Sequence, residues 1–417
     1  MHVKTVRFTF LFLLIISFNR GEAQVIPELK KWLALDYSQR PAFAEQKFAR
    51  KPVTRKVAEE AKALLFEDRK SYLKKAWQAE WTNKEFNLDN YSFKFDYHKF
   101  GDKPAEGRSL YISLHGGGGT TKAVNDQQWR NQLRLYTPAE GIYVAPRAPT
   151  DSWNMWHQDH IDFFLDRLIQ AAIVFEEVNP DKVYIMGYSA GGDGVFQLAP
   201  RMADRWAAAA MMAGHPGDAS ALNLRNIGFT IHMGGDDAAY KRNELATKWG
   251  SLLDSLQSAD PAGYKHEVKV HTGLPHWMNR LDTVAVSWMA QNKRNPWPAK
   301  IIWQQDDVRH NQFYWLGVPA TSNQERQELI VTYTGNEFNI IKSINDTLFI
   351  KVNDEMMNLN KKITVRLHNE KIFSGKIKRS LLPIWRSIEM RTDKQAAFYS
   401  EIIIKGREVS LFNPVHR

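Results

Sequence analysis

The sequence predicts an α/β fold with a doubly wound, mostly parallel sheet, preceded by a helical N-terminal extension and followed by a small all-β domain. Two observations carry this prediction. Short apolar runs alternate with helical patterns over 91–295, which is typical of consecutive β-α-β units. Beyond residue 300 the chain changes to short strand patterns with Asn, Asp and Gly at the turns, which indicates a sandwich-like domain. We therefore expect domains at 24–90, 91–295 and 300–417, with Pro296 and Pro298 in a linker.

The first 23 residues have the pattern of a secretory signal peptide. Lys4 and Arg7 precede the apolar run Phe8–Phe18, and Gly21 and Ala23 are small residues at the positions that a signal peptidase reads. The run is short for a membrane-spanning helix, and no second long apolar run follows it. We therefore expect an exported protein, either periplasmic, secreted or surface-associated, with no membrane span after removal of the signal.

Composition narrows the class of protein further. The chain of 417 residues contains no cysteine, so its fold depends on a core that is large enough to need no disulfides. The formal net charge is +10, but Lys and Arg are spread along the chain and interleaved with Asp and Glu. Such spacing is typical of a solvated surface, so we expect no nucleic-acid partner.

The region before the α/β segment is amphipathic and helical. Its best segment is 53–81, where apolar residues recur at helical spacing, and Pro41 and Pro52 separate shorter helices from it. We expect these helices to pack on the α/β domain as an extension or partial lid. Next, residues 91–97 alternate between apolar and polar side chains, which predicts a half-buried edge strand.

Strands and helices then alternate through the α/β segment. The predicted strands are Ser109–Leu114, Ile142–Ala145, Val183–Met186, Ala207–Met212, Ile227–Met233 and His266–His271, and the predicted helices lie at Ile161–Glu177, after Ser189, at Lys241–Leu256 and at Asp282–Gln291. In the last domain the predicted strands are Phe313–Val318, Leu329–Tyr333, Phe338–Ile344, Thr347–Val352, Ile363–Leu367, Ile372–Ile377 and Phe398–Lys405.

A candidate nucleophile stands between one of these strands and the helix that follows it. The strand Val183–Met186 leads into Gly187-Tyr188-Ser189-Ala190-Gly191, a G-x-S-x-G sequence. In the order strand, sharp turn, helix, this sequence is a nucleophile elbow, and the glycines allow a strained turn without a Cβ clash. Ser189 is therefore the candidate nucleophile.

A candidate acid follows the strand Ile227–Met233. The chain continues Gly234-Gly235-Asp236-Asp237, and the glycines allow a tight exit that can turn a carboxylate back toward the sheet edge. Asp237 is favoured by its distance from the first glycine, and Asp236 is the alternative acid. Both aspartates could instead cap the helix that begins near Lys241.

A candidate base lies in the loop after the last predicted strand. That loop reads Thr272-Gly273-Leu274-Pro275-His276-Trp277, so His276 completes the chain order serine, acid, histidine. His271 is the fallback, although its place inside the strand would bury or pair it.

Acyl transfer also needs donors for the oxyanion that develops on the substrate carbonyl. The N–H of Ala190, directly after the candidate nucleophile, is one expected donor. The second should come from Gly116–Gly119, which follows the strand ending at Leu114, with Gly117 or Gly118 as the donor.

Together these features resemble the α/β-hydrolase superfamily over about Leu110–Trp277. Within it, G-Y-S-A-G-G-D-G followed by L-A-P-R-M-A-D-R-W-A is similar to secreted esterases related to polyhydroxybutyrate depolymerases and feruloyl esterases, and prolyl-oligopeptidase-like hydrolases share much of the pattern. The resemblance implies a serine esterase whose triad is Ser189, Asp237 and His276. It covers neither the N-terminal helices nor the β domain, and the lack of cysteine separates this chain from disulfide-bearing members.

Three further side chains are weaker candidates for a substrate pocket. Trp153 and Trp156 follow a strand at the carboxyl edge of the sheet and could stack on a sugar or an aromatic acyl group, or could plug the space under the N-terminal helices. His215 follows the strand Ala207–Met212 and could line the same pocket.

Two charged residues near these candidates have expected structural roles. Arg147 is expected to pair with Asp151 or Asp159 rather than to bind an acidic substrate group. Asp193 is expected to make a structural hydrogen bond within the elbow.

The functional hypothesis is an exported serine hydrolase that cleaves carboxylic esters through an acyl-enzyme, with no metal or cofactor required. The expected substrate is a small or polymeric ester, which could be linked to carbohydrate. One alternative is a peptidase of the prolyl-oligopeptidase type, which the lack of a propeller-sized domain before the α/β segment disfavours. Another is a polysaccharide-binding protein with an inactive hydrolase fold, in which Trp303, Trp315 and Trp385 of the β domain could contact sugar.

Overall fold

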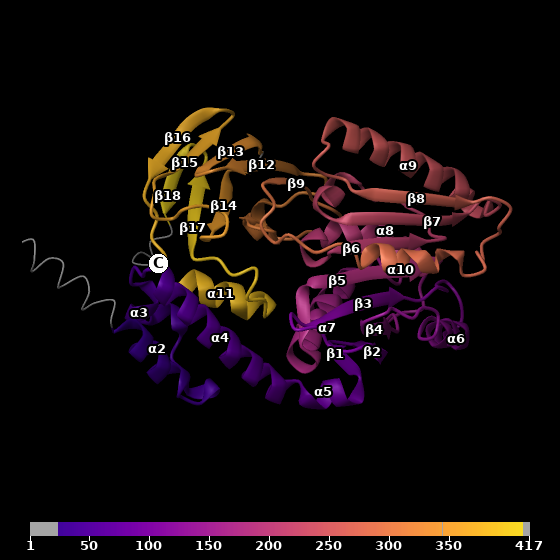
Figure 1. Ribbon diagram of the computed structural model, residues 1–417, viewed down its shortest axis with the longest axis horizontal. Helices are drawn as coiled ribbons and strands as arrows, with labels where there is room; N and C mark the ends of the chain where they lie inside the picture. Colours follow the sequence, from indigo (N-terminus) through magenta and orange to yellow (C-terminus); the bar gives the residue numbers. More distant parts are fainter. Residues whose placement is uncertain (1–23, 344, 412–417) are drawn as a thin grey trace, which may run out of the picture.

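The computed structural model describes residues 24–343 and 345–411 (Figure 1). The expected signal peptide, residues 1–23, lies outside the described residues and stays a prediction. Across the described ranges, none of the helices combines the length and the apolar character that crossing a bilayer requires.

A sheet of eight strands forms the centre of the α/β segment. Its spatial order is β1 (Glu85–Leu88), β2 (Tyr91–Phe100), β4 (Gly141–Pro146), β3 (Arg108–Leu114), β5 (Val178–Tyr188), β6 (Ala208–Met212), β7 (Gly228–Gly234) and β8 (His266–His271). All neighbouring pairs from β4 to β8 are parallel, whereas β2 runs antiparallel to both β1 and β4. The doubly wound, mostly parallel sheet is therefore confirmed.

The sheet is apolar on both faces because helices cover both. Side chains alternate between the faces along each strand, so Leu110 and Ile112 of β3 join one hydrophobic core and Tyr111 joins the other. The first core is closed by α7 (Asp159–Glu176), α8 (Ala190–Arg201) and α9 (Arg242–Ala259), and the second by α10 (Val284–Met289) and the segment after α6 (Lys122–Gln132). This two-sided cover explains why the central strands are continuous apolar runs.

One expectation about the sheet is wrong. Residues 91–97 do not form the edge strand, because β1 pairs with β2 on its outer side. The run Glu85–Leu88 is only four residues long, and its alternation is too short to stand out from the helical pattern before it.

The C-terminal region contains two five-stranded sheets. One has the order β10 (Gln312–Phe313), β11 (Leu316–Gly317), β14 (Thr347–Val352), β17 (Ser400–Lys405), β18 (Glu408–Leu411), and the other β16 (Glu370–Gly375), β15 (Ile363–Leu367), β13 (Glu337–Lys342), β12 (Glu328–Thr334), β9 (Lys300–Gln304). Their pairings are antiparallel except for β13 with β15.

This region is not purely β, because it also contains the helix α11 (Leu381–Arg391). Leu381, Ile384 and Ile388 are buried at helical spacing, and Pro383 lies in the first turn, where its missing N–H costs nothing. The helical spacing is thus present in the sequence, but it occupies a single short segment between strands, and the expectation of an all-β domain overlooks it.

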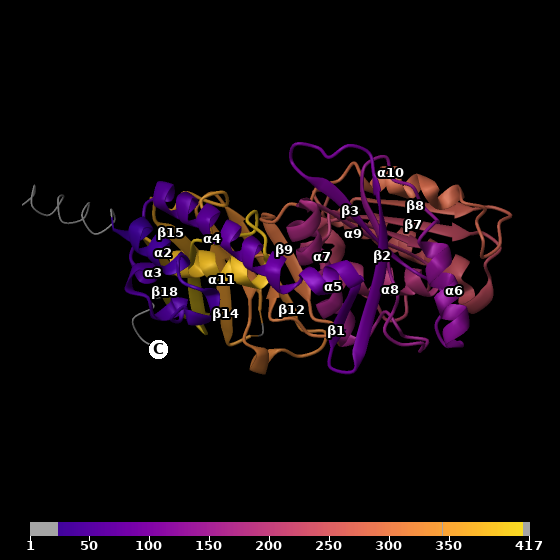
Figure 2. The ribbon, with the colours of Figure 1, turned by 90° about the horizontal axis from the view of Figure 1, so that it is seen from below.

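The N-terminal helices pack mainly on α11 and not over the sheet edge that holds the candidate nucleophile. They are α2 (Val25–Leu33), α3 (Lys47–Arg50), α4 (Arg55–Ala76) and α5 (Gln78–Asn83). Figures 1 and 2 show α4 alongside α11 and continuing through α5 to β1. Val53 pairs with Arg379, and Arg69 binds Glu389 of α11 at 2.9 Å. The partial lid is therefore wrong, whereas packing on the α/β domain as an extension is confirmed by the contacts of α4 with α7 and by the ion pair of Glu80 with Arg167.

Buried ion pairs connect the α/β segment with the C-terminal region. Arg294 lies in the connecting segment and binds Asp181 at 2.7 Å and Asp393 at 2.6 Å, with its side chain only 2% exposed. A second group surrounds Asp162 of α7, which accepts from Arg201 at 3.2 Å and faces His310 Nε2 at 2.7 Å. Breaking a buried pair leaves an uncompensated charge, so these pairs hold the two parts in one arrangement.

The His310–Asp162 contact makes stability depend on pH. Burial acts to lower the pKa of His310, but the hydrogen bond and charge of Asp162 outweigh it, so the pKa is raised. A raised histidine pKa stabilises the folded state below the unfolded value of about 6.5, and this stabilisation is lost as pH rises through the folded pKa. We expect His310→Gln to lower the free energy of unfolding by about 1–2 kcal/mol near pH 6 and by roughly nothing near pH 9.

Urea denaturation of both proteins at the two pH values measures this difference. The exposed His98 gives the matched control, since this histidine has no carboxylate partner among the described residues and His98→Gln removes no ion pair there. A deficit in His310→Gln that stays constant across the pH range would contradict the role of the charged pair.

Candidate active site

Ser189 stands in a strained turn at the carboxyl end of β5. Its backbone has φ 57° and ψ −123°, a conformation that L-residues rarely adopt and that clusters at functional sites. The flanking glycines are required by close backbone approach: a Cβ on Gly187 would lie 2.2 Å from the Gly191 carbonyl oxygen, and one on Gly191 would lie 2.1 Å from that of Leu114. Glycine at both positions therefore lets the elbow pack closely against β3.

The structure brings Ser189, His276 and Asp237 into one hydrogen-bonded chain. Ser189 Oγ lies 3.0 Å from His276 Nε2, and His276 Nδ1 lies 2.6 Å from Asp237 Oδ2. The Asp237 side chain is 2% exposed, whereas the His276 side chain is 41% exposed. A buried carboxylate that orients an accessible imidazole toward a hydroxyl is the arrangement that activates a serine nucleophile.

The two adjacent aspartates have different positions. Asp236 is exposed, and its backbone N–H donates to the Leu274 carbonyl oxygen at 2.9 Å, which joins the acid turn to the histidine loop. Asp237 is buried, and besides His276 its carboxylate contacts Arg242 at 3.4 Å. Asp237 is therefore the carboxylate on the imidazole, and Asp236 contributes through its backbone.

The histidine loop is also held from the elbow itself. Tyr188, next to the serine, donates its hydroxyl to the His276 carbonyl oxygen at 2.6 Å and accepts the Met278 N–H at 3.1 Å. The fallback base His271 is not part of this arrangement, since its Nε2 lies 3.3 Å from His232 Nδ1. Burial lowers the pKa of both of these histidines, that of His232 to about 3.

The glycine-rich loop after β3 lies against the elbow. A Cβ on Gly116 would meet the Ser189 Cβ at 3.2 Å, so the loop passes beside the serine. The Gly118 N–H donates to Asn125 Oδ1 at 2.8 Å, and this corrects the expectation that Gly118 could face a substrate oxygen. In residues 24–343 and 345–411, the N–H groups of Gly117 and Ala190 have no hydrogen-bond acceptor, so both of these expected donors remain available.

Asn125 fixes the shape of the glycine loop. It is fully buried on α6, and besides accepting from Gly118 it donates to Asp151 Oδ1 at 2.9 Å. A Cβ on Gly117, whose φ is +104°, would lie 2.2 Å from Asn125 Oδ1. Sequence reasoning did not single out Asn125, because a polar residue on an otherwise polar helix has no pattern that indicates burial.

His115 and Arg147 extend this support. Nδ1 of the buried His115 donates to the Gly116 carbonyl oxygen at 2.6 Å, and its Nε2 accepts the Ala148 N–H at 3.1 Å. Burial lowers the pKa of His115 to about 4, so the ring is neutral and keeps this tautomer. Arg147 pairs with Asp151, one of its two expected partners, and with Asp126 at 2.9 Å.

Trp153 and Trp156, two of the weaker pocket candidates, lie in different surroundings. Trp153 is 71% exposed beside Gly118 and Gly119, at the rim of the site. Trp156 is 1% exposed, donates Nε1 to the His115 carbonyl oxygen at 2.9 Å and packs against Gly194, so the expectation that it lines a pocket is wrong.

His215 is attached to the elbow by its backbone. Its N–H donates to Asp193 Oδ1 at 2.6 Å, so the structural hydrogen bond of Asp193 is made with the segment after β6 and not, as expected, within the elbow. Burial raises the pKa of Asp193, partly offset by this hydrogen bond and by nearby Arg242. In the described residues, no three His, Asp or Glu side chains are placed to hold a metal ion.

Comparison with known proteins returned no matching family model and no matching curated sequence. Among solved structures, a thermostable esterase matches with a TM-score of 0.39 and 18% identity over 50% of this chain and 62% of that chain. A mutant of the feruloyl esterase module from Clostridium thermocellum complexed with sinapinate matches with a TM-score of 0.36 and 13% identity over 50% and 86%. A phospholipase/carboxylesterase from Dyadobacter fermentans matches with a TM-score of 0.35 and 16% identity over 49% and 99%.

The matched part is about half of this chain, and all three TM-scores lie below 0.5. The fold assignment therefore rests on the sheet itself. Its strand order, the antiparallel β2 and the serine turn between β5 and α8 are those of an α/β-hydrolase fold.

Proposed function

We propose that the protein is a serine hydrolase that cleaves carboxylic esters through an acyl-enzyme intermediate. The observation that carries this proposal is the continuous chain from Ser189 Oγ through His276 to the buried Asp237, with distances of 3.0 and 2.6 Å. The N–H groups of Ala190 and Gly117, for which the described part of the chain offers no acceptor, support the same chemistry.

The proposed reaction has two steps. Ser189 Oγ attacks the ester carbonyl carbon while His276 Nε2 takes the hydroxyl proton, and the carbonyl oxygen becomes an oxyanion that receives the N–H groups of Ala190 and Gly117. Collapse of this intermediate breaks the carbon–oxygen bond to the alcohol, which leaves with the proton from His276. A water molecule, deprotonated by His276, then attacks the acyl-enzyme, and the acid leaves as Ser189 recovers its proton. Asp237 stays ionised and stabilises the imidazolium in both steps.

The surroundings of the serine favour a bulky ester. Trp153, Tyr240 and Trp277 are 71%, 77% and 46% exposed. Trp153 lies after β4, beside Gly118 and Gly119 of the oxyanion loop, Tyr240 follows the acid turn, and Trp277 lies in the histidine loop. An open rim with exposed aromatic faces accepts a large or polymeric substrate more readily than a closed pocket does. We therefore propose that the substrate is a polymeric ester or an ester of an aromatic acid, as for the secreted esterases that the sequence resembles. We also propose that the chain is exported.

A fluorophosphonate probe tests the reaction class directly. The expected result is covalent labelling of Ser189, located by peptide mass spectrometry, together with hydrolysis of at least one ester from a panel of acetyl, butyryl, feruloyl and hydroxybutyrate esters. Cleavage of peptide substrates in preference to esters would support the alternative of a prolyl-oligopeptidase-type peptidase. A serine that resists labelling in a folded protein would instead favour a binding protein with an inactive hydrolase fold.

Asn125 gives a test of the oxyanion loop. Asn125→Ala removes the acceptor of the Gly118 N–H and the donor to Asp151, so the loop loses the contacts that hold Gly117 in place. We expect kcat for p-nitrophenyl butyrate to fall by about tenfold to a hundredfold with KM nearly unchanged, since a misplaced donor affects the transition state more than the bound ester.

The exposed Gln127 on the same helix is the matched control, and Gln127→Ala should retain the wild-type kcat. An Asn125→Ala protein that folds and shows only a raised KM would contradict the assignment, because that result would indicate a role in ground-state binding.

A further inference from the structure

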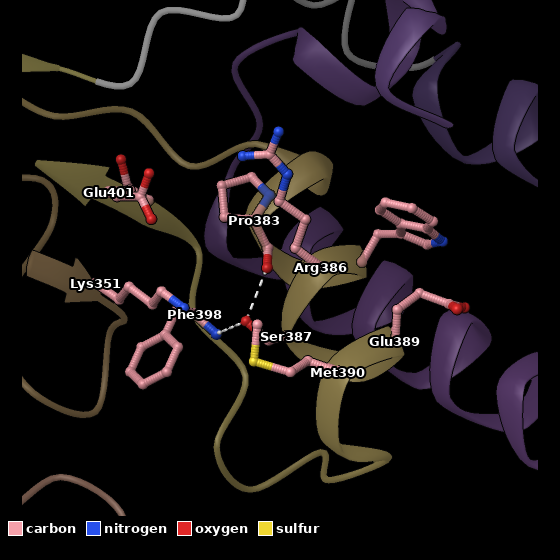
Figure 3. Close-up of a pocket in the computed structure, with 10 residues that line it drawn as sticks. Lys351, Pro383, Arg386, Ser387, Glu389, Met390, Phe398 and Glu401 are labelled. Carbon is pink, nitrogen blue, oxygen red and sulfur yellow. Dashed lines mark hydrogen bonds between the residues drawn. The ribbon is translucent and has the colours of Figure 1, made fainter. Parts of the chain in front are cut away.

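A separate pocket of about 540 Å³ lies between α11 and the strands β14 and β17, outside the sheet that carries Ser189 (Figure 3). Its volume falls in the range of sites that hold small molecules. Helix α11 provides one wall through Pro383, Trp385 and Met390, and the segment that leads into β17 provides Phe398. Met390 is 49% exposed, so it stands at the mouth of the pocket.

The apolar part of the pocket is rigid. Trp385 is stacked on Phe43, with ring centroids 5.1 Å apart, so contact with the N-terminal helices fixes its position. Ser387 Oγ donates to the Pro383 carbonyl oxygen at 2.8 Å and accepts the Phe398 N–H at 3.2 Å, which ties α11 to the opposite wall. An apolar group that enters this space meets preformed walls and requires little rearrangement.

The charged part lies on the two strands. Lys351 of β14 and Glu401 of β17 are directly paired across the strands, and Figure 3 shows the Lys351 side chain extending toward Phe398. Within the described residues the two side chains form no ion pair, and Lys351 Nζ donates only to Gln312. A lysine ammonium has three donors, so two of them remain available to a ligand.

Lys351 is the group of the pocket that favours an anion. The carboxyl group that faces it across the strands, Glu401, has a pKa that is raised by burial, so its negative charge is weakened. The other carboxylate on the lining, Glu389, points away from the pocket in Figure 3 and is bound by Arg69 and by the Tyr37 hydroxyl. Burial also lowers the pKa of Lys351 to about 8, and an anionic partner would restore the charged form.

We propose that this pocket binds a small amphipathic carboxylate, with the carboxylate on Lys351 Nζ and the apolar body against Pro383, Trp385 and Phe398. The proposal does not depend on the catalytic assignment, since no residue of the pocket belongs to the eight-stranded sheet, the elbow or the loops around Ser189.

Isothermal titration of the full chain with octanoate tests the proposal, with octanol and octylammonium as uncharged and cationic analogues. We expect saturable binding of octanoate and much weaker binding of both analogues. Lys351→Met keeps the length of the side chain and removes its charge, and it should weaken octanoate binding by about tenfold or more, as expected for a lost charge-assisted hydrogen bond. Lys371→Met, at an exposed lysine of the neighbouring sheet, should bind as the wild type does.

Met390→Trp gives a second, independent variant, because it fills the mouth of the pocket from an exposed position and should also weaken binding. It decides the result if Lys351→Met does not fold. Absence of saturable octanoate binding would overturn the proposal, as would tighter binding of octylammonium. Undiminished binding in Lys351→Met and Met390→Trp would also overturn it and would place octanoate elsewhere, for example beside Ser189.

Discussion

Ser189→Ala is expected to lower kcat for p-nitrophenyl acetate by roughly 10⁵- to 10⁶-fold, the effect seen when a triad serine is removed. The substitution deletes the Ser189 hydroxyl, which lies 3.0 Å from His276 Nε2, and leaves the imidazole without a nucleophile to deprotonate. Any residual rate should come from the Ala190 and Gly117 N–H groups acting on a water attack. Steady-state kinetics with purified protein measures the effect.

Folding should be unaffected or slightly improved by this change. Ser189 holds a backbone conformation that strains any L-residue, and alanine adopts it at a cost similar to that of serine. The exposed Ser287 on α10 provides the control, and Ser287→Ala should retain the full rate. A Ser189→Ala protein with a rate close to that of the wild type would exclude the acyl-enzyme route.

The order of the site along the chain could be predicted because it depends on local pattern. An apolar run that ends in Gly187 or in Gly234 shows both a strand and its sharp exit, so Ser189 and the acid turn are visible without any tertiary information. The sheet follows from the same alternation of short apolar runs and helices.

What could not be predicted depends on contacts between distant segments. The Gly118 N–H is not available to a substrate because Asn125 Oδ1 accepts it, and Trp156 is buried because it packs against Gly194. The N-terminal helices face α11 because Arg69 and Val53 find partners more than 300 residues later in the chain, at Glu389 and Arg379. The periodicity of a single segment carries no information about partners so far away in the sequence.

Which of the adjacent aspartates orients His276 also depends on such tertiary contacts, and these residues give the second prediction with a large expected effect. Asp237→Asn is expected to lower kcat by about 10⁴-fold, because an amide in place of the carboxylate stabilises the wrong tautomer of His276 and gives no charge to balance the imidazolium. Asp236→Asn should stay within about twofold of the wild type, since its contribution is a backbone N–H to Leu274, which the substitution keeps. The two variants change neighbouring residues in the same way, so each is the control for the other.

The comparison also separates catalysis from stability. Asp237 is 3% exposed and also contacts Arg242, so its replacement removes a buried charge and some stability, which thermal denaturation measures. If activity fell only in proportion to the unfolded fraction, Asp237 would be a structural residue and the imidazole would act without it. If Asp236→Asn were the inactive variant, the acid would have to reach His276 from the exposed side of the turn. The 2.6 Å contact of Asp237 with His276 Nδ1 predicts neither of these two results. Measuring kcat for the folded fraction distinguishes both of them from the expected outcome, in which only Asp237→Asn is strongly impaired.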